Sequence, residues 1–458
     1  MIKHLFFTLI ISLFSTYLYS ANIFIYLNIE NNLSQNFKID IKKLSFYNNH
    51  NKIVTYKIDK IFTSKSDFNQ EFVKKININE GVYNRVMITT EKGILNIPAN
   101  IKINNETGSI YLVWDIRNSF TNGKFSPKIT VKNQKVPLRG ELLFVTSKEE
   151  NALFFIRVDK NQVCSVMGIN GSPVEFVLSC INDKLKILCE NSKDIKIIEV
   201  STFKRSDEFI LPFVIEPDLL ETADDYLIIG DSSNNRLITV NSANGAFENS
   251  VEVGENLSDI IYWSDEKKII VASKNEQIIY ILDKNLQILK SKKLNCSPDS
   301  LYLKDNFLFI SETDCNTLVK LNLKNYSFEK RYRIVSPYKI TIFKSTIFIT
   351  NFFQKFISLI DEQQSFSSKK ITLTFVPSRL AMCERRGWLY VSAKFSKKIG
   401  VIDLFGERAT GVIDIGAKPY DLKVGRSSNK CYYFFKKCDF AHIFCEKYLL
   451  SSDSSISN

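Results

Sequence analysis

The chain has 458 residues, of which 45% are hydrophobic and 24% charged, and it carries a net charge of +12. It contains only three His. This number disfavours the sites that depend on His: a Ser-His-Asp triad, a His-ligated copper or zinc centre and a His-ligated haem. The absence of G-x-S-x-G, P-loop and dinucleotide-binding motifs removes further enzyme classes. The basic residues form no long run, so the charge favours solvated faces, although affinity for an anionic surface stays open.

Residues 1–21 have the layout of a secretory signal peptide. A Lys near the start precedes an apolar stretch from Leu5 to Leu18, and the small residues Ser20 and Ala21 follow. This stretch is shorter than the roughly 20 residues that a membrane-spanning helix needs. No Cys lies near the cleavage region, so we expect no lipid anchor. The sequence therefore predicts a soluble periplasmic or secreted protein, with no transmembrane helix after the signal peptide.

Residues 22–133 carry about seven short strand signals, such as "NIFIYLNI", "FKIDIKKLSFYN" and "SIYLVWDI". Val, Ile, Phe and Tyr crowd into these segments, and turn residues separate them. This density of short strands predicts a β-sandwich domain.

Residues 134–450 repeat one pattern, in which two short apolar runs flank a polar turn, as in "LYVSAKFSKKIGVIDL". The polar residue that closes the second run recurs every 39–42 residues, at Asp159, Ser201, Asn241, Asp283, Asn322, Asp361 and Asp403. A repeat of this length built only from short apolar runs indicates the blades of a β-propeller. Each blade is a small sheet that cannot bury both faces alone, and stacking around an axis gives the blades a shared core.

The repeats resemble the YVTN family of bacterial β-propellers. The segment "PSRLAMCERRGWLYVSAKFSKKIGVIDL" matches the family's blade best, and the signature "YVTN" becomes "YVSA", "FVTS" or "FITN" in this chain. The first domain is similar to an uncharacterised bacterial β-sandwich family, through "FKIDIKKLSFY", "INEGVYNRV" and "YLVWDIRNSFTNGKFSPKITV". These resemblances imply a fold and say almost nothing about an activity.

The expected blade count is seven, with eight as an alternative. Seven candidate inner strands are present. Six lie within residues 172–383 and each begins near a Pro or an Asn, and the seventh is 418–424. The segment 418–424 can supply the inner strand of the first hairpin, 142–159, and so close the ring. Residues 431–450 resemble a further hairpin, and residues 451–458 are expected to be a disordered tail.

Nine Cys are present, and no C-x-x-C motif occurs. Six are scattered through strand-like runs, where buried single thiols are the usual state. A hairpin over 431–450 would place Cys431 opposite Cys445, and a disulfide between them is expected in an oxidising compartment. The cluster of Cys431, Cys438, His442 and Cys445 is also a metal-site candidate, but its spacing fits no standard zinc pattern.

One set of ionisable residues recurs near the start of each inner strand, where propeller side chains face the central channel. Its members are Glu175, Asp218, Asp259, Asp299, Lys339, Arg379 and Asp421. Such a ring of five acids and two bases could bind a divalent cation or a zwitterionic ligand. The alternative interpretation is that these positions are solvated turns, in which Asp is common.

Two functions follow from these observations. The first is a non-catalytic binding or scaffold protein of the cell envelope, whose partner is an envelope protein or a small ligand. The second is a metal-dependent hydrolase or lactonase that holds calcium with the acids of the ring. No cofactor is expected for the first, and a divalent cation for the second; no nucleic-acid-binding motif is present.

Overall fold

A computed structural model describes residues 20–121, 124–134, 138, 140–179, 184–363 and 368–427. The expected all-β class is confirmed, because the helical segments in these ranges are four three-residue turns. No helix in the described ranges is long and apolar enough to cross a membrane. The chain divides into two compact units, the first ending at Gln134 and also taking in Ser165–Gly168.

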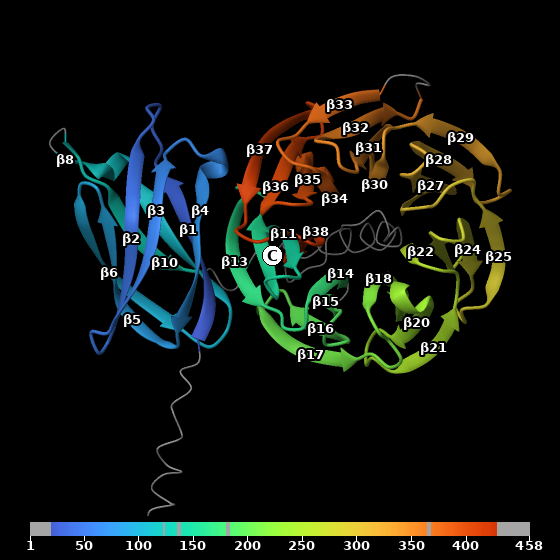
Figure 1. Ribbon diagram of the computed structural model, residues 1–458, viewed down its shortest axis with the longest axis horizontal. Coiled ribbons are helices and arrows are strands. Elements are labelled where there is room, and N and C mark those ends of the chain that lie inside the picture. Colours follow the sequence, from blue (N-terminus) through green and yellow to red (C-terminus); the bar gives the residue numbers. More distant parts are fainter. Residues whose placement is uncertain are drawn as a thin grey trace, which may run out of the picture. The chain divides into compact units, whose positions relative to one another are not determined.

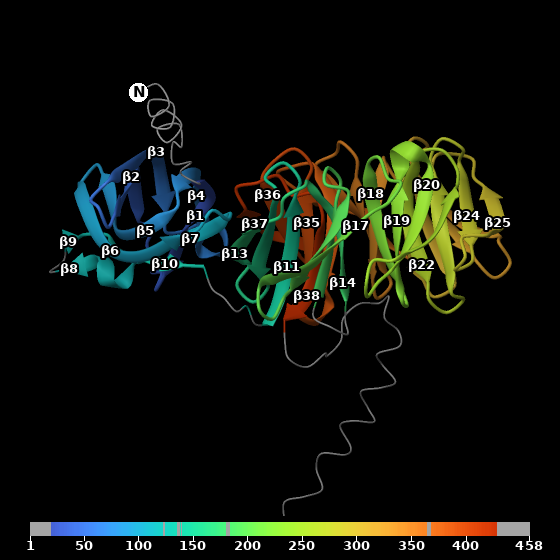
Figure 2. The same ribbon diagram turned by 90° about the horizontal axis from the view of Figure 1, so that it is seen from below.

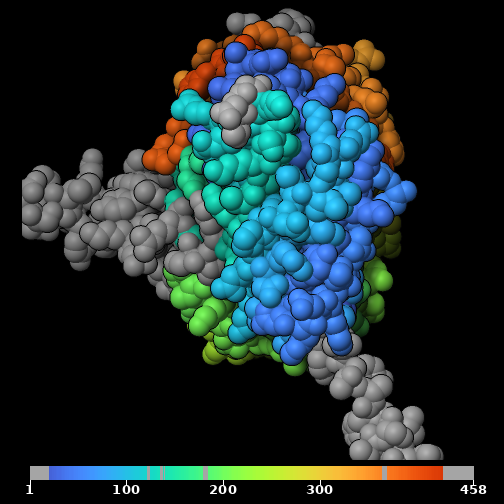
Figure 3. Space-filling model, turned by 90° about the vertical axis from the view of Figure 1, so that its left-hand side faces the viewer, coloured from blue at the N-terminus to red at the C-terminus, as the bar shows by residue number. Residues whose placement is uncertain are grey.

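The first unit contains two four-stranded sheets, with the strand orders β10-β7-β1-β4 and β3-β2-β5-β6. Figure 3 shows its outer surface, coloured blue to cyan. Its strands are β1 (Ser20–Glu30), β2 (Lys38–Asn48), β3 (Ile53–Thr63), β4 (Gln70–Asn79), β5 (Gly81–Thr90), β6 (Gly93–Ile103), β7 (Gly108–Asp115) and β10 (Lys128–Asn133), with a short ribbon of β8 (Phe120–Thr121) and β9 (Lys124–Phe125).

Both sheets of the first unit contribute side chains to a single hydrophobic core. Ile25 of β1, Phe46 of β2 and Trp114 of β7 are fully buried in it. The alternation of side chains along each strand turns one face of each sheet toward this core. β1 begins at Ser20, and Ala21 is 1% exposed. The last two residues of the expected signal segment therefore belong to a strand, and the second of them, Ala21, belongs to the core.

The second unit contains seven four-stranded sheets in its described residues, each antiparallel and most following the chain order. Figure 1 shows them arranged around a central axis, and Figure 2 shows the unit edge-on, with strands running from one face to the other. This arrangement is consistent with a β-propeller-like fold. The strands are β11 (Gly140–Ser147), β12 (Ala152–Arg157), β13 (Gln162–Gly168), β14 (Pro173–Ser179), β15 (Lys184–Cys189), β16 (Asp194–Glu199), β17 (Lys204–Ile210), β18 (Pro217–Ala223), β19 (Tyr226–Asp231), β20 (Arg236–Asn241), β21 (Phe247–Glu252), β22 (Leu257–Trp263), β23 (Lys268–Ser273), β24 (Ile278–Leu282), β25 (Ile288–Lys293), β26 (Ser300–Lys304), β27 (Phe307–Glu312), β28 (Thr317–Asn322), β29 (Phe328–Arg333), β30 (Pro337–Phe343), β31 (Thr346–Asn351), β32 (Phe356–Asp361), β33 (Ser368–Thr372), β34 (Pro377–Cys383), β35 (Trp388–Ala393), β36 (Lys398–Asp403), β37 (Arg408–Asp414) and β38 (Leu422–Ser427).

One sheet joins the two ends of the second unit. β38 pairs antiparallel with β11, so that Leu142 lies opposite Gly425, and the sheet order is β13-β12-β11-β38. The sequence assigned this inner strand to residues 418–424, and the paired strand begins slightly later, at Leu422. A strand contributed from the far end of the sequence closes the ring and removes an open sheet edge.

The middle and outer strands of the sheets differ sharply in composition. Every residue of β19 is buried, as expected for a strand with sheets packed on both faces. In β17, "KRSDEFI", six of the seven residues are exposed. Charged outer strands discourage edge-to-edge pairing with other chains.

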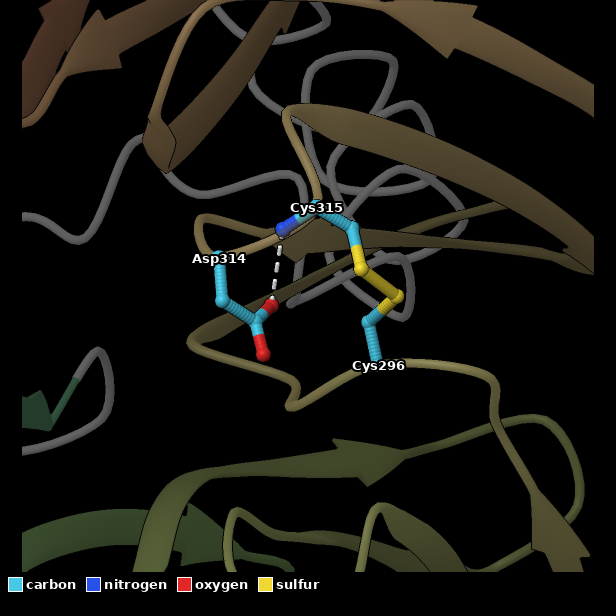
Figure 4. A group of neighbouring side chains, drawn as sticks. All are labelled: Cys296, Asp314 and Cys315. Carbon is cyan, nitrogen blue, oxygen red and sulfur yellow. Dashed lines mark hydrogen bonds between the residues drawn. A yellow bond between two sulfur atoms is a disulfide. The ribbon is translucent and has the colours of Figure 1, made fainter.

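The structure corrects one expectation about cysteine. Cys296 and Cys315, expected to be single thiols, form a disulfide with a Cα–Cα distance of 6.2 Å (Figure 4). Cys296 lies in the loop before β26 and Cys315 in the turn after β27, and sequence spacing alone could not show that these loops meet. Cys189 and Cys383 are buried thiols, as expected. The predicted Cys431–Cys445 disulfide and the 431–450 hairpin lie outside the described residues.

Candidate ligand site in the central cavity

The inner strands of the second unit all begin at the same end of the ring, which we call the mouth face. At this end, the turn between the second and third strand of a sheet bonds to the segment that leads into its inner strand. The Lys274 amide donates to Asn256 O (2.9 Å), the Phe352 amide to Ser336 O (2.7 Å) and the Lys394 amide to Val376 O (2.9 Å). These bonds place the turns and the starts of the inner strands on one face.

A cavity of about 180 Å³ lies among the inner strands near this face. Its lining comes from β14, β18, β22, β26, β30, β34 and β38, with the residue before β38. Seven of its lining side chains are ionisable: Glu175, Glu221, Asp259, Lys339, Arg379, Asp421 and Lys423.

Five of the seven residues of the predicted ring line this cavity: Glu175, Asp259, Lys339, Arg379 and Asp421. Asp218 and Asp299 do not. Asp218 Oδ1 accepts hydrogen bonds from the Ser232 amide and hydroxyl, at 3.2 and 2.7 Å. Asp299 accepts from the Thr313 amide at 3.1 Å and pairs with Lys274 at 2.5 Å. Both acids therefore hold the turn of their own sheet.

The difference is a matter of register. Counted from the Pro or Leu that opens each inner segment, cavity-lining residues such as Glu175, Asp259 and Lys339 lie two positions later. Asp218 and Asp299 lie only one position after Pro217 and Pro298. A shift of one residue along a strand moves a side chain to the opposite face. The sequence analysis accepted residues at one or two positions after the opening residue, and it therefore combined side chains from both faces of the inner strands.

The same alternation identifies residues that the sequence analysis missed. Ser300 is the true equivalent of Asp259 in its sheet, and it lines the cavity. Glu221 and Lys423 lie two residues beyond Leu219 and Asp421, on the same strand face, and they also line it. The period of two along a strand could have found all three.

The charges inside the cavity pair with one another and do not form opposite walls. Lys339 Nζ lies 3.0 Å from Asp259 Oδ2, although the two strands belong to sheets that are not adjacent. Arg379 Nη1 lies 2.5 Å from Glu175 Oε1 and 3.5 Å from Asp421 Oδ1. One guanidinium thus serves two buried carboxylates, both less than 10% exposed.

The pKa values reflect this sharing. Burial acts to raise the pKa of Glu175, but the Arg379 guanidinium and the ammonium groups of Lys423 and Lys339 together outweigh it, and the pKa falls below its usual range. At Asp259 burial is likewise outweighed, here by Lys339 together with hydrogen bonds from the Leu301 amide and the Ser300 hydroxyl, so the pKa of Asp259 is lowered. At Asp421 burial prevails over Lys423 and Arg379, and the pKa is raised. A raised carboxyl pKa makes proton uptake easier at this one position.

The carboxylates of the cavity are largely occupied as acceptors, whereas its cations keep spare donors. Asp259 Oδ2 accepts from the Ser300 hydroxyl (2.8 Å), the Leu301 amide (2.9 Å) and Lys339. Glu175 Oε2 accepts from the Leu220 amide at 2.9 Å.

Among the described residues, the contacts of Arg379 with acids all use Nη1, which leaves Nε and Nη2 available. Lys423 Nζ is 4.0 Å from its nearest carboxylate, on Asp421. A guanidinium has five N–H groups and an ammonium three. Arg379 and Lys423 therefore keep N–H groups that make no hydrogen bond to an acid of the described residues, in a cavity that holds four acids and three cations.

A comparison with known protein families finds no match, and neither does a search of curated proteins. Among solved structures, the chain is similar to a functionally unknown protein from Desulfotomaculum acetoxidans, with a TM-score of 0.54 and 11% identity, over 63% of this chain and 99% of that one. It is also similar to dihydro-heme d1 dehydrogenase NirN in complex with DHE, with a TM-score of 0.50 and 12% identity, over 62% of this chain. The match spans 65% of the NirN chain. At such low identity the likeness supports a β-propeller-like fold alone.

Proposed function

We propose that the chain is a non-catalytic binding protein of the cell envelope that holds a small oxygen-rich ligand in the central cavity of a β-propeller. One observation carries this proposal: seven ionisable side chains from the inner strands line one cavity, with paired carboxylates and spare cationic donors. Buried charges are costly unless they are paired, so a cluster of this kind is retained only where its cost is offset.

The proposed architecture is a seven-bladed propeller of the YVTN type that follows a β-sandwich. Seven four-stranded sheets in the described part of the second unit support the blade count, and β38 closes the ring through β11. Two sheets that share one core support the sandwich.

The proposed location is the periplasm or the cell exterior. The apolar stretch near the N-terminus supports export. The disulfide between Cys296 and Cys315 supports an oxidising compartment, because disulfides are rare in the cytosol.

The alternative function, a calcium-dependent hydrolase or lactonase, has no specific observation in its favour. Calcium takes six to eight oxygen ligands. Here Glu175 and Asp259 already accept from cations and amides, so a metal ion would have to displace Arg379 and Lys339.

Thermal unfolding in the presence of acetate, succinate, glycine, glycerol or calcium tests the proposal. We expect succinate or acetate to raise Tm, since a ligand at 100 times its Kd stabilises the fold by about 2.7 kcal/mol. Lys423→Gln should reduce the shift, because Lys423 lines the cavity and its side chain is 35% exposed, so its loss leaves the fold intact. Lys132→Gln, which removes an exposed pair with Glu30 in the first unit, is the matched control. A shift with calcium alone would overturn the proposal in favour of the metal-dependent alternative.

A further inference from the structure

Four aromatic rings form a continuous track on the mouth face, which we call the aromatic rim: Tyr338, Phe352, Phe353 and Phe395. Their successive ring centroids are 5.4, 4.4 and 6.1 Å apart. The rings of Phe353 and Phe395 are nearly parallel, at 9°, and these residues are 64% and 63% exposed. Such a pair offers a flat apolar surface to a partner.

The track leads from the exposed surface to the cavity. Phe352 and Phe353 lie in the turn between β31 and β32, and Phe395 lies in the corresponding turn of the next sheet, between β35 and β36. The ammonium of the cavity residue Lys339 lies 5.7 Å from the Tyr338 ring centroid. The rim is therefore continuous with the proposed ligand site.

The turn that carries Phe353 departs from the pattern of its equivalents. In five sheets the last residue of this four-residue turn has a positive φ: Asn151, Lys193, Asn235, Gln277 and Asn316. In the β31–β32 turn it is the second residue, Phe353, with φ +62°. A bulky side chain in the left-handed region is disfavoured, and such strain often marks functional positions.

Basic groups surround the rim. Lys394 Nζ lies 3.0 Å from the Phe352 ring centroid and 4.6 Å from that of Phe353, so its ammonium is held on the ring faces. Burial, together with the neighbouring ammonium groups of Lys274 and Lys418, lowers the pKa of Lys394.

We propose that the rim and the cavity together bind a short extended peptide, whose apolar side chain packs on Phe353 and Phe395 and whose carboxylate enters the cavity to meet Arg379 and Lys339. This inference rests on the proposed binding function. Phe rings offer no polar group to hydroxyls of a sugar, and they suit an apolar side chain. The carboxylate complements the spare N–H donors of the cavity.

The separations of the rings also limit the length of the peptide. The three centroid separations limit the track to about 16 Å, which corresponds to about five extended residues at roughly 3.3 Å each. The cavity of about 180 Å³ has room for one side chain or one chain terminus and excludes a folded domain.

Fluorescence anisotropy with labelled hexapeptides tests the proposal. The probes carry Phe at one end, a Gly/Ser spacer and Asp at the other, and matched probes carry Asn in place of Asp. A free or amidated C-terminus in each set distinguishes a side-chain carboxylate from a terminal one. We expect a carboxylate probe to bind at least about tenfold more tightly than the probe without any carboxylate, which corresponds to about 1.4 kcal/mol.

The rim itself is tested with the double variant Phe353→Asn, Phe395→Ser, which we expect to weaken the peptide at least about tenfold and to leave succinate binding unchanged. Phe213→Asn is the matched control, because Phe213 is 67% exposed, has φ +62° and lies outside the rim. If succinate binds but the peptides bind no more tightly than succinate does, the rim proposal fails and the proposed function stands. If neither binds, both fail. Equal weakening by Phe213→Asn would also overturn the role of the rim.

Discussion

Two buried glutamates of the second unit, Glu141 and Glu312, are both held by arginine, yet their pKa values move in opposite directions. Glu141 pairs with Arg385 at 2.5 Å and with Arg386 at 2.9 Å. These two cations outweigh the effect of burial, and the pKa of Glu141 is lowered. Among the described residues, Glu312 pairs with one cation, Arg331, at 3.3 Å, and its Oε1 has no hydrogen-bond partner. Burial then dominates and raises the pKa of Glu312 to about 7.

This comparison shows that a buried acid stabilises the fold only when enough close cations offset its desolvation. The cavity lies between the two cases, because Glu175 and Asp421 share Arg379. The acid closer to the guanidinium has a lowered pKa, and the other a raised pKa. The cavity therefore holds one acid of each kind: Glu175 is compensated by the cations around it, and Asp421 is compensated only in part.

The largest effect is expected from Glu141→Gln. This substitution leaves Arg385 and Arg386 without the carboxylate that they share between the sheet of β11 and the sheet of β34 to β37. Breaking a buried ion pair costs 3–5 kcal/mol, and both arginines are partly exposed, so we expect a loss of about 3 kcal/mol. Urea unfolding at pH 7 measures it.

The matched control for Glu141→Gln is Glu149→Gln, which breaks an exposed pair with Lys418 and should cost less than about 1 kcal/mol. Because the pKa of Glu141 is lowered in the folded state, its contribution is present above the unfolded pKa and is lost as the pH falls through the folded pKa. Equal losses of stability in both variants, or a loss that persists at low pH, would contradict a stabilising role for the pairing of Glu141 with Arg385 and Arg386.

Glu312→Gln should have the opposite sign. The folded pKa of about 7 exceeds the ordinary value of 4.5, so stability is highest below pH 4.5 and falls as the pH rises through 7. The full change is about 3 kcal/mol at 1.36 kcal/mol for each pH unit. The neutral amide removes this dependence, so the variant should be more stable than the parent by about 3 kcal/mol at pH 8 and similar to it at pH 4. If the stability of the variant and that of the parent changed with pH in the same way, Glu312 would not titrate near pH 7.

The cavity pair tests the intermediate case. Glu175→Gln removes the acid nearer to Arg379, and because Asp421 still contacts the guanidinium we expect a loss of about 2 kcal/mol. Asp421→Asn should raise Tm at pH 8, since it removes a carboxylate whose ionisation is opposed by burial, and the gain should vanish in acid. Denaturation of both variants at pH 5 and pH 8 shows whether each substitution lowers or raises stability. Two losses of similar size would mean that Arg379 compensates both acids equally.

The sequence predicted the all-β class and five of the cavity residues because both depend on local period. Alternation places residues such as Glu175 and Lys339 on the inner face of their strands, and the 39–42 residue repeat brings these strands to one axis. Asp218 and Asp299 were misplaced by a single position, since the first residue of each inner strand cannot be read from sequence to that precision.

Long-range contacts lay beyond this reasoning. The pairing of Lys339 with Asp259 joins strands 80 residues apart, and the Cys296–Cys315 disulfide depends on how two loops approach. The aromatic rim has the same origin: Phe353 and Phe395 occupy turns of neighbouring sheets, and nothing local to either turn shows that their rings stack.

The smallest effect on stability is expected from a substitution in the aromatic rim, where backbone conformation and not charge sets the sign. Phe353→Asn should stabilise the fold by about 1 kcal/mol, because Asn tolerates the left-handed region that Phe353 occupies at φ +62°. Phe213→Asn should give a gain of the same size, since Phe213 shares that φ and a similar exposure. Only Phe353→Asn should weaken the acidic hexapeptide, so a gain in Tm and a loss of affinity must appear in the same variant. A Phe353→Asn protein that is more stable and still binds the peptide at full strength would mean that its strained turn has no part in recognition.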